Sequence, residues 1–352
     1  MKNIHNILIT WYLKNLRALP WRETTNPYKI WLSEIILQQT RVDQGLPYYH
    51  RFIGQYPTIS DLANAPDDEV MKLWQGLGYY SRAKNLLHTA RIIATEYHGV
   101  FPTTFELIKQ MKGIGDYTAA AIASFAFNVK QPVLDGNVYR FITRLYGIET
   151  PIDKKETRKA VMEVLLHLMN ETQKPAVLNQ ALMEFGALQC TPKKPKCEAC
   201  PFVQDCFAIK ENKVGILPMK GKPIKIRDRY LNYFVFITPD HRTYIKKRIE
   251  KDVWLNLYDF PLIETLTNQT MKELTLHPDF KTWTKSSKVK AIEVCPLVLH
   301  KLSHQNLFVT FIVLQIDKPL KLKNSPIFEI EKNIINSFAV PKVIENFLHR
   351  IR

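Results

Sequence analysis

The sequence predicts two folded regions, the first mainly helical and the second of the α+β class. Three observations lead to this prediction. Apolar residues recur at helical spacings of three and four through the first region, as in Ile30, Trp31 and Ile35. β-branched and aromatic runs replace that pattern beyond residue 229, and a Lys- and Pro-rich stretch with few large apolar residues separates the two regions. We therefore expect a helical domain over residues 1–206, a linker over 207–228 and an α+β domain over 229–352.

Start and stop signals place individual elements along the chain. Pro66, followed by three acidic residues, is typical of a helix start. Helices are predicted over residues 105–110 and 119–127, and Gly147 should end a helix that starts near Asn137. In the second region, strands are predicted over residues 233–237, 243–248 and 307–314, and a short helix over 338–347.

Composition narrows the class of protein. Apolar residues make up 46% of the chain and charged residues 23%, a globular mixture that excludes a disordered, collagen-like or disulfide-dense chain. No run approaches the ~20 uncharged apolar residues of a membrane span, and the N-terminus has no signal-peptide pattern. We therefore expect a cytoplasmic protein, associated with the nucleoid if it is bacterial. The formal net charge of +16 favours an anionic partner, most often nucleic acid.

Four of the five cysteines lie within 17 residues, with the spacing C-x6-C-x2-C-x5-C. In a chain without an export signal, this cluster indicates a metal centre rather than disulfides. Four thiolates at these separations can bind a zinc ion or an iron–sulfur cluster, and ligand softness does not separate the two. The candidate ligands are Cys190, Cys197, Cys200 and Cys206, whereas Cys295 lies in an apolar run and is expected in the core.

Gly113 and Gly115 lie between two predicted helices. A tight hairpin at this point would direct the backbone N–H groups at the start of the second helix outward, where they can hold a phosphate. The arrangement is typical of a helix-hairpin-helix element that binds DNA. The alternative is an ordinary connection between two helices.

Two acidic residues are candidates for catalysis. Glu34 is flanked on a predicted helix by Ile30 and Trp31. A carboxyl group among apolar neighbours has a raised pKa, so Glu34 can serve as a general acid at neutral pH; the alternative is a surface residue on the polar side of the helix. Asp135 precedes the helix that starts near Asn137, where it is either the N-cap or a carboxylate that stabilises a cation.

The combination of these features closely resembles the iron–sulfur DNA glycosylases of the endonuclease III superfamily, and within it the A/G-specific adenine glycosylases of the MutY family. The resemblance covers most of residues 8–206 and is carried by residues 21–22, 27–34, 37–42, 74–83, 113–119 and 134–138 together with the four cysteines. It implies a helix-hairpin-helix domain with a [4Fe-4S] cluster in the loop 190–206. It also implies a monomer that binds double-stranded DNA.

The same resemblance implies roles for individual residues. Glu34 would protonate the adenine and then activate water, while Asp135 would stabilise the sugar cation. Tyr117 and Asn137 would help to position the sugar and the two carboxyl groups. DNA contacts are implied for Arg22, Gln39, Thr40, Tyr79, Gly113 and Gly115, of which Gln39 and Tyr79 would wedge into the base stack.

Tyr117 occupies the position at which bifunctional members of the superfamily carry a lysine that cuts the DNA backbone. Because a phenol is not an amine nucleophile, we expect a monofunctional glycosylase rather than a bifunctional endonuclease. Monofunctional glycosylases for G:T mismatches share this change, so the C-terminal region must separate the two activities. A non-catalytic iron–sulfur protein that only binds DNA would not need Glu34 and Asp135, so the presence of both acids argues against it.

The C-terminal region resembles the MutT-like, or Nudix-like, domain of the MutY family, and residues 254–262 match a family stretch. The family's loop for 8-oxoguanine carries Phe-Ser-His, which corresponds here to Leu302, Ser303 and His304. Leucine can still act as an apolar wedge, but ring stacking is lost. The implied substrate is adenine opposite 8-oxoguanine or guanine. A MutT-type nucleotide hydrolase is the alternative, but its signature is rich in glycine and no glycine follows Gly221.

Overall fold

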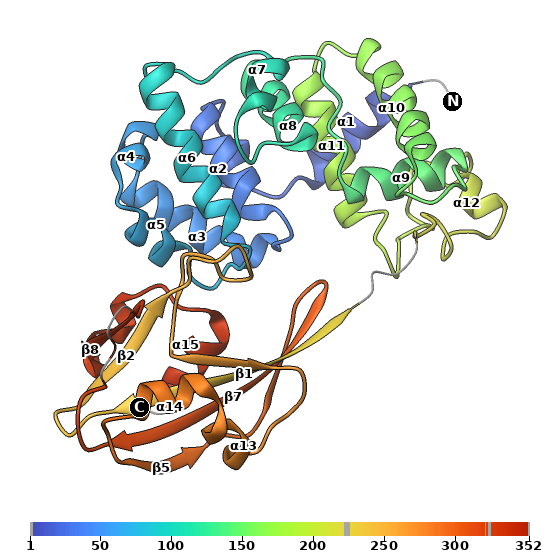
Figure 1. The fold of residues 1–352 in the computed structure, drawn as a ribbon. Coiled ribbons are helices and arrows are strands. Elements are labelled where there is room, and N and C mark those ends of the chain that lie inside the picture. The colour runs from blue at the N-terminus through green and yellow to red at the C-terminus, as the bar shows by residue number, and fades with distance from the viewer. Residues whose placement is uncertain (1–2, 222–225, 321, 323–324, 351–352) are drawn as a thin grey trace. The chain divides into compact units, whose positions relative to one another are not determined.

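The computed structural model describes residues 3–221, 226–320, 322 and 325–350 (Figure 1). The chain divides into two compact units. Unit 1 comprises Met1–Asn64 and Asn85–Lys222, and unit 2 comprises Ala65–Lys84 and Pro223–Arg352. In these described ranges no helix combines the length and apolar character that crossing a bilayer requires. Residues 65–84 thus group with the C-terminal strands, although they lie inside the helical part of the sequence.

The described residues of unit 1 form helices and turns. Local signals set the helix ends: α2 begins where the Asn26 side chain accepts a hydrogen bond from the Lys29 N–H, with Pro27 at the first position. α9 ends at Gly147, whose φ of 72° is a left-handed conformation that glycine adopts without strain. The helices are α1 (Ile4–Asn15), η1 (Pro20–Arg22), α2 (Pro27–Leu37), α3 (Val42–Gln55), α4 (Ile59–Asn64), α6 (Ser81–Glu96, which begins in unit 2), α7 (Phe105–Gln110), α8 (Asp116–Phe127), α9 (Gly136–Tyr146), α10 (Lys155–Asn170), α11 (Pro175–Leu188) and α12 (Phe207–Lys210).

Aromatic rings fill the core where α11 packs against α1 and α9. Phe141 of α9, Phe185 of α11 and Phe202 of the cysteine loop form a triangle with ring centroids 4.6, 5.5 and 5.4 Å apart. Such edge and tilted contacts add to the hydrophobic stabilisation of the buried area. Because Phe202 belongs to the cysteine loop, this core anchors that loop to the helices.

Unit 2 contains a mixed five-stranded sheet with the order β4-β1-β7-β5, to which β6 is added by pairing with β7. β1 and β7 run parallel and the other pairs are antiparallel. A three-stranded antiparallel sheet has the order β3-β2-β8. The elements are α5 (Asp67–Trp74), β1 (Arg227–Ile237), β2 (Arg242–Lys247), β3 (Tyr258–Asp259), β4 (Leu262–Thr265), α13 (Met271–Leu276), α14 (Pro278–Thr284), β5 (Val289–Val294), β6 (Val298–Lys301), β7 (Gln305–Ile316), β8 (Ile327–Glu331), η2 (Lys332–Ser337) and α15 (Lys342–Arg350).

Side-chain alternation along β1 supplies two separate apolar clusters. Tyr233 and Val235 belong to the cluster that α15 covers, whereas Phe234 and Phe236 belong to the cluster covered by α13 and α14. β1 is therefore buried on both faces. This explains why its sequence reads as a continuous apolar run rather than as an alternation of apolar and polar residues.

Most predicted elements match the structure, and the differences have local causes. The helix over 105–110 is confirmed, and α8 starts three residues before the predicted 119 because Gly115 is its N-cap. The prediction of the C-terminal helix is wrong by several residues, because α15 spans Lys342–Arg350 rather than 338–347. Pro341 accounts for this shift, since a proline disfavours helical backbone in the residue before it. Cys295 is buried, as expected of a core residue.

The segment predicted as a linker over residues 207–228 is partly ordered. α12 spans Phe207–Lys210, and Ala208 within it is completely buried. Leu217 is buried as well, and Arg144 donates a hydrogen bond to its carbonyl oxygen (2.9 Å). Residues 222–225 of the predicted linker lie outside the described residues. A few buried residues therefore attach this stretch to unit 1, although its low apolar content predicted a linker.

Candidate active site

A cavity of about 490 Å³ in unit 1 contains the four candidate catalytic residues. Its volume is typical of a small-molecule site. Glu34 comes from α2, Tyr117 from the first turn of α8, and Asp135 and Asn137 from the start of α9. The structure therefore brings together residues that lie far apart in the sequence.

Glu34 is buried on a helix that is apolar at nearly every position, and it lines this cavity with only 6% of the residue exposed. The Tyr117 hydroxyl donates a hydrogen bond to Oε2 of Glu34 at 2.7 Å. Burial raises the pKa of Glu34 to about 7; the nearby charge of Asp135 also raises it, while Tyr117 and Arg22 oppose the shift. A large fraction of Glu34 is therefore protonated at neutral pH, as a general acid requires.

Of the two roles that the sequence left open for Asp135, the structure shows the N-cap, and stabilisation of a cation stays a prediction. Its Oδ1 accepts hydrogen bonds from the backbone N–H groups of Asn137 (2.9 Å) and Val138 (2.7 Å), so Asp135 is the N-cap of α9. Its Oδ2 accepts from Asn137 Nδ2 (2.7 Å), and Arg140 in turn donates to Asn137 Oδ1 (2.7 Å). Burial raises the pKa of Asp135 against these hydrogen bonds. The carboxylate is consequently held in one orientation at the edge of the cavity.

A third carboxylate in the cavity wall was missed by the sequence interpretation. Glu184 of α11 is completely buried and accepts paired hydrogen bonds from Arg17 (2.8 and 2.6 Å) and from Arg22 (2.9 and 2.7 Å). Burial by itself would raise the pKa of Glu184, but hydrogen bonds from the two arginines hold it at about 2. The sequence could have identified Glu184 as a candidate, because it is the one charged residue of α11. Arg22, for which a DNA contact is implied, lines the cavity as a partner of Glu184.

A Glu184→Gln variant is expected to be less stable than the wild type at neutral pH. A carboxyl group whose pKa is lowered by folding contributes stability that is complete above its unfolded pKa and is lost as the pH falls toward the folded value. A shift from 4.5 to about 2 corresponds to at most about 3 kcal/mol above pH 5, which solvent screening reduces. Denaturant unfolding at pH 7 and pH 3 measures this difference, with exposed Glu163→Gln on α10 as the control. The same loss at both pH values would contradict the assignment.

The two glycines form the predicted hairpin between α7 and α8. The turn is closed by a hydrogen bond from the Ile114 N–H to the Met111 carbonyl (3.1 Å). Gly113 has a φ of 81°, and a Cβ there would lie 2.6 Å from the Cβ of Asn85, so other residues are excluded by both strain and space. Gly115 is the N-cap of α8 without a capping side chain. The first N–H groups of this twelve-residue helix are thus not capped by that residue and can bind a phosphate.

The two residues expected to wedge into the base stack share an unusual backbone conformation. Gln39, two residues beyond α2, has a φ of 55°, and Tyr79 has a φ of 47°. Residues other than glycine rarely adopt this region, and such strain is concentrated at functional sites. Gln39 and Thr40 line the cavity of unit 1. Tyr79, in unit 2, is 46% exposed.

The tripeptide Leu302-Ser303-His304 forms the turn between β6 and β7. The Leu302 N–H donates to the Gln305 carbonyl (2.8 Å), so Ser303 and His304 form an exposed tip. Within unit 2, the hydroxyl of Ser303 contacts the hydroxyl of Tyr79. Leu302 is partly buried and packs against the apolar core of unit 2, and its role as an apolar wedge stays a prediction. The exposed part of the turn is therefore polar.

The four clustered cysteines line a single cavity in unit 1. Phe141, Phe185 and Phe202 surround it, and Arg144 Nη1 donates to the sulfur of Cys190 (3.4 Å). Four thiols in an apolar setting, with an N–H donor to sulfur, fit an iron–sulfur cluster, whose properties depend on such hydrogen bonds. Lys193, Lys194 and Lys196 of the same loop are exposed.

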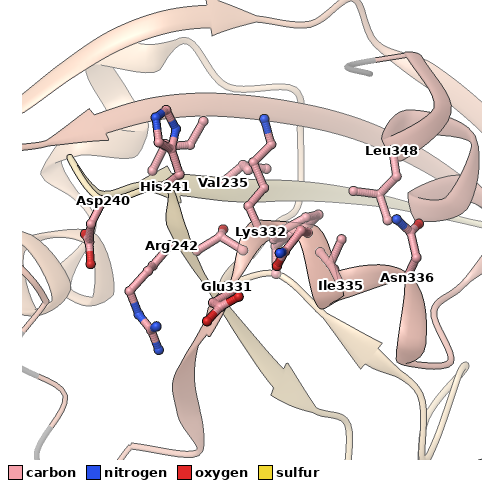
Figure 2. Close-up of a pocket in the computed structure, with 13 residues that line it drawn as sticks. Val235, Asp240, His241, Arg242, Glu331, Lys332, Ile335, Asn336 and Leu348 are labelled. Carbon is pink, nitrogen blue, oxygen red and sulfur yellow. The ribbon is translucent and has the colours of Figure 1, made fainter.

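A second cavity of about 490 Å³ lies in unit 2 (Figure 2). Val235, Ile335 and Leu348 provide apolar surface, and the carboxylates of Asp240 and Glu331 belong to exposed residues. The two cavities are equal in volume, so chemistry distinguishes them. The described lining of the second cavity includes no buried carboxyl group, whereas the cavity of unit 1 is lined by the buried Glu34 and Glu184 and by the partly buried Asp135.

Comparison with known proteins agrees with this geometry. Residues 32–167 match the HhH-GPD superfamily of base excision DNA repair proteins, and residues 190–206 match the iron–sulfur binding domain of endonuclease III. The adenine DNA glycosylase of Buchnera aphidicola subsp. Schizaphis graminum is 35% identical over 348 residues, which cover 97% of this chain and 96% of that protein. The cofactor of the cysteine loop is therefore a [4Fe-4S] cluster.

Solved structures share the fold of unit 1. A thermostable thymine-DNA glycosylase has a TM-score of 0.55 and 31% sequence identity, covering 60% of this chain and 96% of that one. An endonuclease III in a non-covalent complex with DNA has a TM-score of 0.50 at 22% identity, covering 59% of this chain and 94% of that one. The helical part is thus the common element of these structures.

Proposed function

Because the chain belongs to the adenine DNA glycosylases of base excision repair, we propose that it removes adenine paired with 8-oxoguanine or guanine, by hydrolysis alone. The observation that carries this proposal is the pair of carboxyl groups in one cavity, the buried Glu34 and the partly buried Asp135. None of the described residues that line this cavity is a lysine. The phenol of Tyr117 is hydrogen-bonded to Glu34 and is not an amine nucleophile, which supports a glycosylase without a strand-cutting step.

The first step is protonation of the base. An adenine flipped out of the duplex enters the cavity of unit 1. Glu34 then donates its proton to N7, which its pKa of about 7 permits at physiological pH. The hydrogen bond from Tyr117 fixes the orientation of the Glu34 carboxyl group. Protonation makes adenine a better leaving group, and the N-glycosidic bond breaks through an oxocarbenium-like state, as in the hydrolysis of glycosides.

The second step is capture of the sugar cation. Asp135, fixed by the N–H groups of Asn137 and Val138, places a carboxylate of defined orientation beside the positive charge. Glu34, now ionised, accepts a proton from a water molecule whose oxygen bonds to C1′ of the sugar. The same residue thus acts first as an acid and then as a base, and the products are free adenine and an abasic site.

DNA binding rests on the hairpin and the cysteine loop. We expect the protein to bind double-stranded DNA as a monomer, with the N–H groups at the start of α8 on a phosphate. Cys190, Cys197, Cys200 and Cys206 would hold the [4Fe-4S] cluster and so fix the loop 190–206, on which Lys193, Lys194 and Lys196 are exposed. Because the chain carries a net charge of +16, its binding to DNA should weaken steeply as salt is added.

A single-turnover assay on duplexes that contain A:8-oxoG, A:G, A:T and G:T tests the proposed function. Each product is analysed with and without alkali, which cuts the strand at an abasic site. We expect strand cleavage only after alkali, fastest for A:8-oxoG, slower for A:G and absent for A:T. Cleavage without alkali would contradict hydrolysis alone. Activity on G:T but not on A:8-oxoG would assign the chain a mismatch specificity instead.

A further inference from the structure

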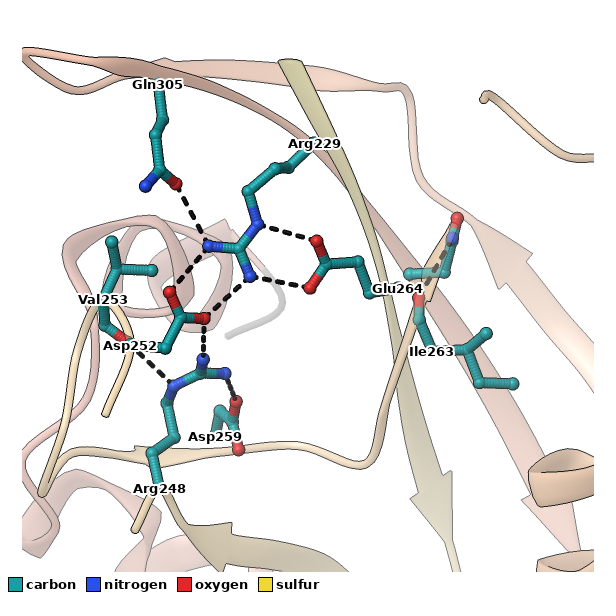
Figure 3. A network of polar contacts seen from close by, with 9 residues as sticks. Arg229, Arg248, Asp252, Val253, Asp259, Ile263, Glu264 and Gln305 are labelled. Carbon is teal, nitrogen blue, oxygen red and sulfur yellow. Dashed lines mark hydrogen bonds and ion pairs between the residues drawn. The ribbon is translucent and has the colours of Figure 1, made fainter. Parts of the chain in front are cut away.

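A network of charged side chains in unit 2 joins two surface loops (Figure 3). The first loop connects β2 to β3 and carries Trp254, which has a positive φ of 64°. The second is the turn between β6 and β7, with Ser303 and His304 at its tip. Both loops are separated in sequence from β1, which supplies the central residue of the network, Arg229.

Arg229 uses every N–H group of its guanidinium. Nε and Nη2 donate to the two carboxylate oxygens of Glu264 (2.7 and 2.6 Å), and Nη1 and Nη2 donate to those of Asp252 (2.8 and 2.7 Å). The fifth donor, on Nη1, is bound by Oε1 of Gln305 (3.0 Å). Because a guanidinium is planar and rigid, five simultaneous hydrogen bonds define the positions of all three partners.

Arg248 extends this network into the loop of Trp254. It shares Asp252 with Arg229 (3.1 Å) and donates to Oδ2 of Asp259 (2.8 Å) and to the carbonyl of Val253 (3.0 Å). Its guanidinium also lies 5.9 Å from the ring of Trp254. The side chains of Arg229 and Arg248 are each only 8% exposed. The loop is thus connected to β1 through two buried arginines that share Asp252.

Gln305 connects the network to the second loop. Its side chain accepts from Arg229, while its backbone carbonyl accepts the N–H of Leu302 that closes the turn. The Arg227 N–H of β1 donates to the His304 carbonyl (3.1 Å). Gln305 is therefore the residue through which the guanidinium of Arg229 acts on the exposed tip.

Stability alone does not account for this arrangement. The two arginines are buried, but Asp252 and Glu264 are exposed, and such ion pairs add little net stability, because desolvation and the loss of side-chain freedom offset the attraction. An exposed two-residue tip, in contrast, is free to sample many conformations unless its base is held, and that freedom is lost when it binds a ligand. A rigid guanidinium at the base of the turn reduces this cost before DNA is bound.

We propose that Gln305, held by Arg229, is a positioning residue that keeps the Ser303–His304 tip in one orientation and thereby sharpens discrimination between 8-oxoguanine and guanine opposite adenine. This inference rests on the proposed function, in which the turn contacts the base opposite adenine. It assigns Gln305 no contact with that base. Its effect should therefore be seen in the ordering of the free protein as well as in substrate preference.

The matched variants are Gln305→Leu, which removes the acceptor at similar volume, and Gln305→Glu, which keeps an acceptor oxygen for Arg229. We expect Gln305→Leu to reduce the A:8-oxoG to A:G ratio of single-turnover rates about tenfold, the value of one hydrogen bond to a charged group. The A:G rate itself should change less than about twofold, since the acid pair of unit 1 is untouched. Gln305→Glu should retain most of the preference.

Hydrogen exchange at the amides of residues 302–304 in the free protein provides the second measurement. Gln305→Leu should exchange faster than the wild type there and Gln305→Glu should not, while thermal unfolding verifies that both variants fold. Unchanged exchange and an unchanged rate ratio in Gln305→Leu would overturn the inference. A wild type that shows no preference for A:8-oxoG would refute the proposed function instead, and hydrogen exchange would still decide whether Gln305 orders the turn.

Discussion

A Glu34→Gln variant is expected to release adenine about 10³-fold more slowly than the wild type at pH 7, or more slowly still, because it has no proton to give to N7. Glutamine preserves the volume of the side chain and can accept the hydrogen bond of Tyr117. Single-turnover cleavage of an A:8-oxoG duplex, read after alkali, measures the loss. The wild-type rate should itself fall about tenfold per pH unit above the pKa of about 7, as the protonated fraction declines.

The same substitution should stabilise the protein at alkaline pH. Folding raises the pKa of Glu34 from 4.5 to about 7, so the folded state binds the proton more tightly. The contribution of this proton to the free energy of unfolding is complete below the pKa of the unfolded chain. It is lost as the pH rises through the pKa of the folded protein, so the folded protein is less stable by about 3 kcal/mol above pH 7. Glu34→Gln removes this cost, so its advantage in denaturant unfolding should appear between pH 5 and pH 8. Exposed Glu163→Gln should show no such gain.

An Asp135→Asn variant is expected to lose about 10²- to 10³-fold in the rate of adenine release, because a neutral amide stabilises the sugar cation less than a carboxylate does. Asparagine is as good an N-cap as aspartate, so α9 should be retained. The negative charge of Asp135 raises the pKa of Glu34. Without it, the pKa of Glu34 falls, and the decline in rate should begin at a lower pH than in the wild type.

The pH profile of the single-turnover rate separates this explanation from simple damage to the fold. A damaged site would lower the rate equally at every pH, whereas loss of the Asp135 charge also moves the alkaline limb of the profile. An unchanged limb would contradict the electrostatic coupling between Asp135 and Glu34. Circular dichroism would verify that the helical content is unchanged.

Several features of the site could be predicted from local sequence because they depend on residues close together in the chain. The apolar neighbours of Glu34 lie within one helical turn, so spacing was enough to single it out as a candidate general acid. The N-cap role of Asp135 needs only the next three residues. Gly113 is required by a turn of a few residues, where its φ of 81° excludes other side chains.

Other features depend on contacts between distant residues, and spacing carries no information about them. Glu184 showed the same signal as Glu34, a single acid on an apolar helix, yet the two have opposite pKa shifts. The difference lies in their partners, since Arg17 and Arg22 meet Glu184 only in the folded chain. The partly buried Leu302 packs against the core of unit 2, a contact that spacing does not reveal either.

The sequence by itself determined the helical and α+β regions, the four cysteine ligands, the glycine hairpin and the two acids proposed for catalysis. These follow from periodicity, spacing and residue chemistry over short segments. Only the tertiary structure decided that both acids share a cavity with Glu184, that residues 65–84 group with the C-terminal strands, and that Gln305 is bound to Arg229. These depend on long-range packing, which places side chains from distant segments within hydrogen-bonding distance and so sets their charge and orientation.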